Sequence, residues 1–152
     1  MEQAVAVERT IWINAPREKA WQAVTRAEHL DLWYATCCRW EIPALQVGTM
    51  VKFFHKDSNS DTDILQATIE VINPLRQFTL RWQPDKTYPA MTLVTTFMLE
   101  EENGGTRVTI IESGYEALPD DLRQQWLDQT GVGYAGSMEN LQAYLEGRSL
   151  PH

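Results

Sequence analysis

The sequence LPDDLRQQWLDQTGVGYAGSMENLQAYLE, residues 118–146, predicts one long helix near the C-terminus. The helix opens at Leu118-Pro119, and Gly147 is a good stop after Glu146. Apolar residues recur along it at spacings of three, four and seven, which places them on one continuous face: Leu127, Tyr134, Met138, Leu141 and Leu145. Such a helix needs a second element that covers its apolar face.

The chain before this helix is mostly a series of strand patterns. Runs rich in β-branched and aromatic residues, bounded by Gly, Pro, Asn or Asp, predict strands at residues 5–13, 37–42, 50–55, 64–72, 76–83, 91–101 and 107–114. Residues 102–106 join the last two strands, and their Asn-Gly-Gly turn is a strong hairpin signal. We therefore expect these strands to pair as an antiparallel sheet.

Two short helices are predicted between the first two strands. Pro16 suits the first turn of one helix, and Asn14 or Ala15 precedes it as the cap. Thr25 can cap the other helix, which covers residues 27–33. The order of a strand, two short helices, a run of strands and one long helix favours a single α+β domain over residues 1–152. In this fold a curved antiparallel sheet wraps around the C-terminal helix.

Three glycines, Gly131, Gly133 and Gly136, crowd the long helix. Each interior glycine costs about 1 kcal/mol relative to alanine, so each needs a reason. They indicate either close packing or a kink, or a thin helix surface that leaves room for a ligand.

Composition and charge disfavour several classes of partner. The formal net charge of −8 argues against nucleic acid and against anionic membrane lipid, because both need clustered Lys and Arg. Residues 1–10 do not have the pattern of a signal peptide, and no run approaches the roughly 18 apolar residues of a membrane span. The only cysteines, Cys37 and Cys38, are adjacent and are best interpreted as reduced thiols. We therefore expect a cytoplasmic protein.

Three segments of the chain resemble one known family. Residues 13–25, INAPREKAWQAVT, with Trp33-Tyr34 shortly after, are similar to its opening signature, and residues 106–115, TRVTIIESGY, to its last-strand signature. Gly133-Tyr134 and residues 138–147, MENLQAYLEG, are similar to its final-helix signature. Together they resemble the Hsp90 ATPase activator homologue family, within the START-like (SRPBCC) helix-grip superfamily that includes the Bet v 1-type proteins. Tyr134 departs from the pattern, because family members usually carry Trp there.

The resemblance implies a helix-grip fold but does not imply one function. The superfamily holds lipid carriers, hormone receptors, cyclases, ring-opening enzymes and co-chaperone domains, and its motifs mainly concern packing. Proteins that resemble this one often pair as dimers through sheet or helix surfaces. A homodimer and a chaperone partner are therefore both possible implications of the resemblance.

Aromatic residues have the best claim to line a cavity between the sheet and the long helix. Rigid aromatic walls suit apolar ligands. The predicted lining residues are Trp33, Tyr34, Phe53, Phe78, Trp82, Phe97, Glu112, Tyr134 and Met138. Most aromatic side chains in such a set fill the core, and the cavity itself is expected near Trp33, Tyr34, Trp82 and Tyr134.

Glu112 is the most interesting polar residue of the sequence. It shares one face of its predicted strand with Val108 and Ile110, and we assign this face inward. Glu112 would then lie near one end of the cavity, where its carboxyl group could hydrogen-bond a ligand or act as an acid or base. The alternative is a Glu112 that is solvated, or paired with an arginine, at the end of the strand.

Catalytic and metal-binding patterns are not evident in the sequence. His29, His55 and His152 lack metal-ligand spacing, and there is no Gly-x-Ser-x-Gly elbow. Residues 57–68 begin like a calcium loop, but Thr62 and Thr68 occupy the positions that require Gly and Glu, so we interpret residues 56–63 as a solvated loop. Cys37 and Cys38 have no evident histidine partner. We expect no metal and no cofactor.

Three functional hypotheses follow. The first is the binding of a hydrophobic or aromatic small molecule in the cavity, with Glu112 as its polar contact. The second is a co-chaperone-like interaction module, which the resemblance implies, although the chain shows no second Hsp90-binding region. The third is a cyclase- or hydrolase-type enzyme that uses the same cavity.

Overall fold

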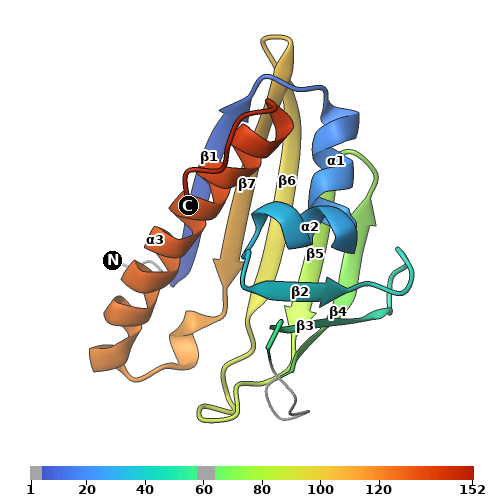
Figure 1. Ribbon diagram of the computed structural model, residues 1–152. Coiled ribbons are helices and arrows are strands. Elements are labelled where there is room, and N and C mark those ends of the chain that lie inside the picture. The colour runs from blue at the N-terminus through green and yellow to red at the C-terminus, as the bar shows by residue number, and fades with distance from the viewer. Residues whose placement is uncertain (1–4, 58–63) are drawn as a thin grey trace.

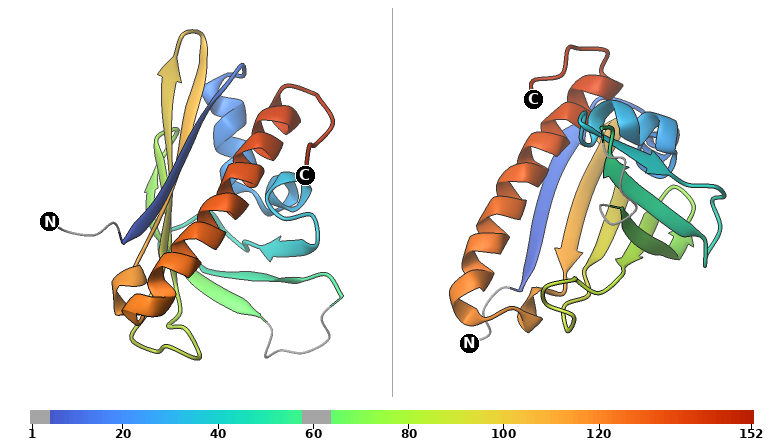
Figure 2. Two further views of the ribbon diagram at one scale, coloured as in Figure 1. Left: turned by 90° about the vertical axis from the view of Figure 1, so that its left-hand side faces the viewer. Right: turned by 60° about the horizontal axis from the view of Figure 1, so that its bottom comes forward.

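A seven-stranded antiparallel sheet curls around a long helix in the computed structural model, which describes residues 5–57 and 64–152 (Figure 1). The strands lie in the order β1-β7-β6-β5-β4-β3-β2, so the first and last strands of the chain are neighbours. Helix α3 (Asp120–Leu145) lies on the concave side of the sheet (Figure 2). The predicted α+β helix-grip fold is confirmed. Residues 58–63 lie outside the described residues. They include most of the loop predicted at residues 56–63 and the start of the calcium-like pattern after Asp57.

The predicted elements are present, with ends that shift by a few residues. The strands are β1 (Ala6–Ile13), β2 (Cys38–Glu41), β3 (Met50–His55), β4 (Leu65–Asn73), β5 (Gln77–Trp82), β6 (Val94–Glu102) and β7 (Gly105–Ser113). The shorter helices are α1 (Arg17–Thr25), α2 (Ala27–Trp33) and the 3-10 turn η2 (Tyr115–Ala117). None of the described helices has the length and hydrophobicity that crossing a membrane requires.

The β6–β7 hairpin has a tighter turn than the sequence predicted. Its loop contains only Asn103 and Gly104, whose φ angles are 50° and 80°. Two successive positive φ angles match the right-handed twist of the paired strands, and Asn-Gly is the sequence that adopts them most readily. Gly105 and Thr106, which were expected in the loop, already pair with β6.

The core fills the space between the concave face of the sheet and α3. Val108 and Ile110 of β7 are fully buried there, as alternation along the strand predicted. The residues of the predicted apolar face of α3 are buried or partly buried against the sheet: Leu127, Tyr134, Met138, Leu141 and Leu145. The helix is therefore held by its apolar stripe.

Helices α1 and α2 close one end of this core (Figures 1 and 2). The indole N–H of Trp33 donates to the carbonyl of Ala23 at 2.8 Å, which ties α2 to α1. The amide of Asn140 donates to the carbonyl of Trp33 at 3.3 Å, which ties α2 to α3. The core is thus closed at this end, and the cavity described below opens at the other.

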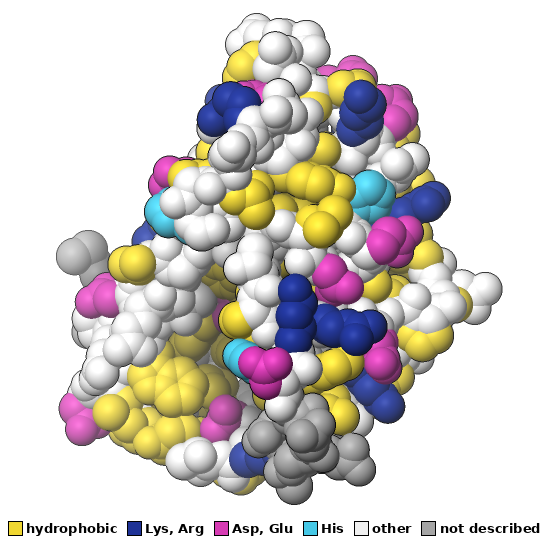
Figure 3. Space-filling model, in the orientation of Figure 1, with side chains coloured by type: hydrophobic (Ala, Val, Ile, Leu, Met, Phe, Trp, Pro, Cys, Tyr) yellow, Lys and Arg dark blue, Asp and Glu magenta, His cyan; other side chains and the backbone are white. Residues whose placement is uncertain are grey.

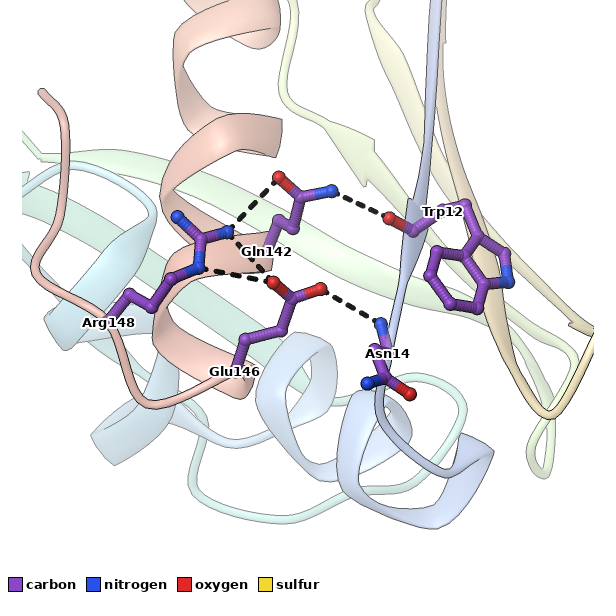
Figure 4. A network of polar contacts seen from close by, with 5 residues as sticks. All are labelled: Trp12, Asn14, Gln142, Glu146 and Arg148. Atoms are coloured by element: carbon purple, nitrogen blue, oxygen red, sulfur yellow. Dashed lines mark hydrogen bonds and ion pairs between the residues drawn. The ribbon is translucent and has the colours of Figure 1, made fainter.

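A polar network fastens the C-terminal end of α3 to the end of β1 (Figure 4). The Gln142 amide donates to the carbonyl of Trp12 at 2.8 Å, and the backbone N–H of Asn14 donates to the Glu146 carboxylate at 3.0 Å. Arg148 forms an ion pair with Glu146 at 2.9 Å. The hydrogen bond from the Asn14 N–H, followed by the one from Arg148, lowers the pKa of Glu146 from its ordinary value.

We expect Glu146→Gln to destabilise the protein by about 1 kcal/mol at neutral pH, because a charge-assisted hydrogen bond is lost. A carboxyl group whose pKa is lower in the folded state stabilises that state above its unfolded pKa and loses this effect as the pH falls through its folded pKa. The difference between the two proteins should therefore shrink in acid, below about pH 4.5. Urea titrations at several pH values measure it. Glu139→Gln, on the same helix and with a side chain 55% exposed, should change stability little at any pH.

Candidate functional site

A cavity of about 590 Å³ opens on the concave side of the sheet, between α3 and the strands β3, β4 and β5. Figure 3 shows this face of the molecule hollowed beside α3, with hydrophobic side chains on the walls of the hollow. The lining residues come from every layer of the fold: Tyr34, Phe53, Ile64, Leu65, Gln66, Trp82, Gln83, Pro84, Asp85, Lys86, Met91, Leu93, Glu112 and Tyr134. The volume lies within the range of small-molecule sites.

Aromatic rings form one wall of the cavity. Tyr34 lies 5.8 Å from Phe53 and 6.3 Å from Tyr134 between ring centroids, with edge-to-face geometry in both pairs. Behind this wall, the buried Trp40 contacts Phe53 at 4.8 Å and Trp82 at 5.9 Å. Because each ring packs against others, the wall presents a rigid apolar surface.

The carboxylate of Glu112 lies at the inner end of the cavity and is held by three hydroxyl groups. Its Oε1 accepts a hydrogen bond from Tyr115 at 2.6 Å. Its Oε2 accepts two more, from Thr95 at 2.6 Å and from Tyr134 at 2.5 Å. The residue is only 6% exposed. The inward-facing strand face therefore does carry Glu112 into the interior, and within residues 5–57 and 64–152 the arginine ion pairs involve other carboxylates.

Two of the hydroxyl groups that donate to Glu112 themselves accept a hydrogen bond from a second donor. The Trp82 indole, which can only donate, donates to the Thr95 hydroxyl at 2.9 Å, so the Thr95 proton is available for Glu112. The Tyr34 hydroxyl likewise donates to that of Tyr134 at 3.3 Å, so the Tyr134 proton points to Glu112. Two donor chains thus converge on one acceptor, the Glu112 carboxyl group.

The tyrosines of this network remain donors over a wide pH range. Burial raises the pKa of Tyr34, Tyr115 and Tyr134 above the ordinary value of 10.0. The negative charge of Glu112 acts in the same direction on all three, because it opposes a second negative charge nearby.

Tyr115 reaches Glu112 because the chain reverses directly after β7. Gly114 adopts φ 112°, a conformation that residues with a Cβ atom rarely adopt. A Cβ at this position would lie 2.2 Å from the carbonyl oxygen of Thr92, so the reversal needs glycine for space as well. The turn brings Tyr115, itself 1% exposed, back under the carboxylate that lies three residues earlier.

The structure brings five of the predicted lining residues to the cavity and leaves four elsewhere. Tyr34, Phe53, Trp82, Glu112 and Tyr134 line it. The other four are at most 2% exposed and lie in the closed core: Trp33, Phe78, Phe97 and Met138. Phe78 and Phe97, for example, stack on one another with centroids 6.5 Å apart.

Sequence reasoning missed Thr95 and Tyr115, although both donate to Glu112. Thr95 does lie in the same alternating series as Phe97 and Leu99, so its inward direction was available from the pattern. Tyr115 had no such signal, since it lies beyond the strand. The outer wall was missed too, because Pro84, Asp85 and Met91 belong to an irregular loop.

The helix glycines do not make room for a ligand. A Cβ on Gly131 would lie 2.2 Å from the guanidinium of Arg9 on β1, and one on Gly136 would contact the ring of His152 at 3.5 Å. Gly133 faces open space. None of the three glycines borders the cavity, and Gly131 faces the end of the exposed Arg9 side chain.

Cys37 and Cys38 lie outside the cavity, with their sulfur atoms 3.1 Å apart. His55 is the cross-strand neighbour of Cys38, which the sequence did not indicate. Burial, followed by the hydrogen bond with Cys37, raises the pKa of Cys38 to about 11, so its thiol is protonated at neutral pH and is a poor nucleophile. Within residues 5–57 and 64–152, no group of three His, Cys, Asp or Glu side chains is placed to hold a metal ion.

Comparison with known families identifies the chain. The family model described as Activator of Hsp90 ATPase homolog 1-like protein matches residues 14–146. The chain belongs to this family. No curated protein matches it.

Solved structures share the fold of this family member. Protein MLL2253 from Mesorhizobium loti has a TM-score of 0.75 and 21% identity, over 95% of this chain and 99% of that one. The Aha1 dimer from Colwellia psychrerythraea has a TM-score of 0.70 and 19% identity, over 94% of this chain and 97% of that one. DynU16, a protein in the dynemicin biosynthetic locus, has a TM-score of 0.72 and 18% identity, over 96% of this chain but 49% of that one. At such identities the likeness concerns the fold.

Proposed function

We propose that the protein binds a hydrophobic or aromatic small molecule in the cavity between the sheet and α3. The observation that carries the proposal is an aromatic-walled space of about 590 Å³ with one buried carboxylate at its inner end. Ligand sites typically combine such apolar walls with a few fixed polar groups that orient the ligand. The rings of Tyr34, Phe53 and Trp82 provide the apolar walls, and Glu112 provides the polar group.

A neutral fluorescent probe tests this proposal. We expect 6-propionyl-2-dimethylaminonaphthalene to bind with a Kd of about 1–100 μM, and binding to be at least about tenfold weaker in Leu93→Trp, because a larger side chain at a lining position fills the cavity. Val47→Trp adds the same indole at a position that is 64% exposed and outside the cavity, so it should bind the probe normally. Equal affinities in all three proteins, or no binding, would contradict the proposal.

The purified protein also permits a search for the natural ligand. Native mass spectrometry followed by denaturing extraction should recover a co-purifying apolar molecule, and the same spectrum reports whether the protein is a monomer or a homodimer. The Aha1 protein from Colwellia psychrerythraea, whose fold is similar, is a dimer.

The rival hypotheses differ in what they need from Glu112. A chaperone-binding role rests on the family description and acts through the surface, so it predicts capture of Hsp90 at stoichiometric level and no effect of Glu112→Gln. An enzymatic role makes Glu112 the acid or base, so it predicts loss of turnover in the same variant with folding intact.

A further inference from the structure

The surroundings of Glu112 also indicate the chemical class of the ligand. We infer that the cavity selects an organic cation, an amine with an aromatic or other apolar body, whose ammonium group lies against Glu112. This inference rests on the proposed function, since it needs the cavity to be a binding site. It follows from four properties of the site: an uncompensated charge, a free acceptor position, cation-compatible walls and a negative overall field.

The first property is a buried charge that lacks a counter-charge. The hydroxyl groups of Thr95, Tyr115 and Tyr134 all donate to Glu112, yet all three are neutral. The ion pairs of the arginines and of His152 within the described residues join carboxylates other than Glu112. A buried carboxylate is costly unless a positive charge accompanies it. A ligand cation would supply that charge from the cavity side.

The second property is room for one more donor. A carboxylate offers about four acceptor positions, and the protein uses three of them. Glu112 also borders the cavity directly, so a ligand can reach its remaining position. An ammonium N–H fits this position as a charge-assisted hydrogen bond, which is shorter and stronger than one from a neutral donor.

The third property is the chemistry of the walls near the carboxylate. Tyr34, Trp82 and Tyr134 line the cavity together with Glu112. The faces of aromatic rings attract cations, with Trp the strongest, and this attraction increases where water is excluded. The other charged lining residues, Asp85 and Lys86, lie on the β5–β6 loop, and Lys86 is exposed. The inner part of the cavity therefore combines a carboxylate with aromatic side chains.

The fourth property is selection against anions. A ligand carboxylate or phosphate at the inner end would meet the charge of Glu112 at close range, which costs free energy for both groups. The net charge of −8 acts in the same direction over longer distances and draws cations toward the protein. The cavity should thus discriminate among ligands of one shape by their charge alone.

Three naphthalene probes of matched shape test the inference: 2-(1-naphthyl)ethylamine, 2-(1-naphthyl)ethanol and 3-(1-naphthyl)propanoate, titrated by calorimetry at neutral pH. We expect the amine to bind at least about tenfold more tightly than the alcohol, and the acid to bind most weakly. In Glu112→Gln the preference for the amine should fall to within about twofold, with alcohol binding retained. Glu100→Gln, an exposed position on β6, removes the same charge from the protein and should leave the preference unchanged.

The outcomes separate this inference from the proposed function. If the amine and the alcohol bind equally well to the unsubstituted protein, or if Glu112→Gln keeps the preference, the inference is overturned while the cavity remains a binding site. If Leu93→Trp fails to weaken the neutral alcohol, the proposed function itself is overturned. The amine-to-alcohol ratio in the unsubstituted protein needs no variant, so it decides the inference even if Glu112→Gln does not fold.

Discussion

Replacement of Trp33 by alanine is expected to lower the free energy of unfolding by about 3–5 kcal/mol, since it removes a large side chain from a closed part of the core. Trp33 is fully buried, contacts Tyr34 and Phe97 edge-to-face at 5.5 Å and 6.5 Å, and donates to the carbonyl of Ala23. The substitution leaves a cavity and an unpaired carbonyl at the junction of α1, α2 and α3. A domain with a typical stability of about 5–15 kcal/mol would lose a large part of it.

Urea titration followed by circular dichroism measures this effect. Leu32→Ala is the matched control, because Leu32 lies next to Trp33 on α2 but is 54% exposed. We expect the control to change stability by no more than about 0.5 kcal/mol. A loss below about 1 kcal/mol in Trp33→Ala would mean that the core collapses into the vacated space. It would also contradict our placement of Trp33 in the closed core.

The fold could be predicted from the sequence because its signals are local. The apolar stripe of α3 and the alternation along β7 can each be recognised in a short stretch of sequence. The structure buries the residues that both patterns place inward. Where the predicted end of a strand was wrong, a nearby hydrogen bond accounts for the difference. Strand β6 begins at Val94 rather than Met91, since the Met91 N–H turns to the carbonyl of Tyr88.

The candidate site was harder to predict, because alternation gives the direction of a side chain but not its depth. Phe78 and Trp82 point the same way from β5, yet Phe78 is in the closed core and Trp82 lines the cavity. Whether a side chain of β5 is in the closed core or lines the cavity depends on which other segments pack over that end of the strand. Those segments are distant in the sequence, so the strand pattern does not contain this information. Glu112 was found by its strand face, whereas its partner Tyr115 depends on a chain reversal that the pattern does not contain.

That reversal gives the second large prediction: Gly114→Ala should destabilise the protein by about 2–4 kcal/mol and weaken ligand binding. At φ 112° an alanine is strained, and its Cβ would lie 2.2 Å from the carbonyl oxygen of Thr92 and 3.2 Å from the Cα of Leu93. Neither atom belongs to a flexible side chain, so the backbone itself must move. The shift would displace Leu93, which lines the cavity, and Tyr115, which holds Glu112.

The control for Gly114→Ala is a second glycine-to-alanine substitution, which should raise the stability rather than lower it. Gly133 lies within α3 with no atom within 4 Å of an added Cβ, so Gly133→Ala should stabilise the protein by about 0.5–1 kcal/mol. Thermal unfolding gives the stability of both variants, and titration with the neutral alcohol probe gives their binding. If Gly114→Ala unfolds at the normal temperature and binds normally, the turn is not what positions Tyr115 under Glu112. If it is destabilised and its remaining folded protein binds weakly, a single glycine couples the stability of the sheet end to the geometry of the carboxylate.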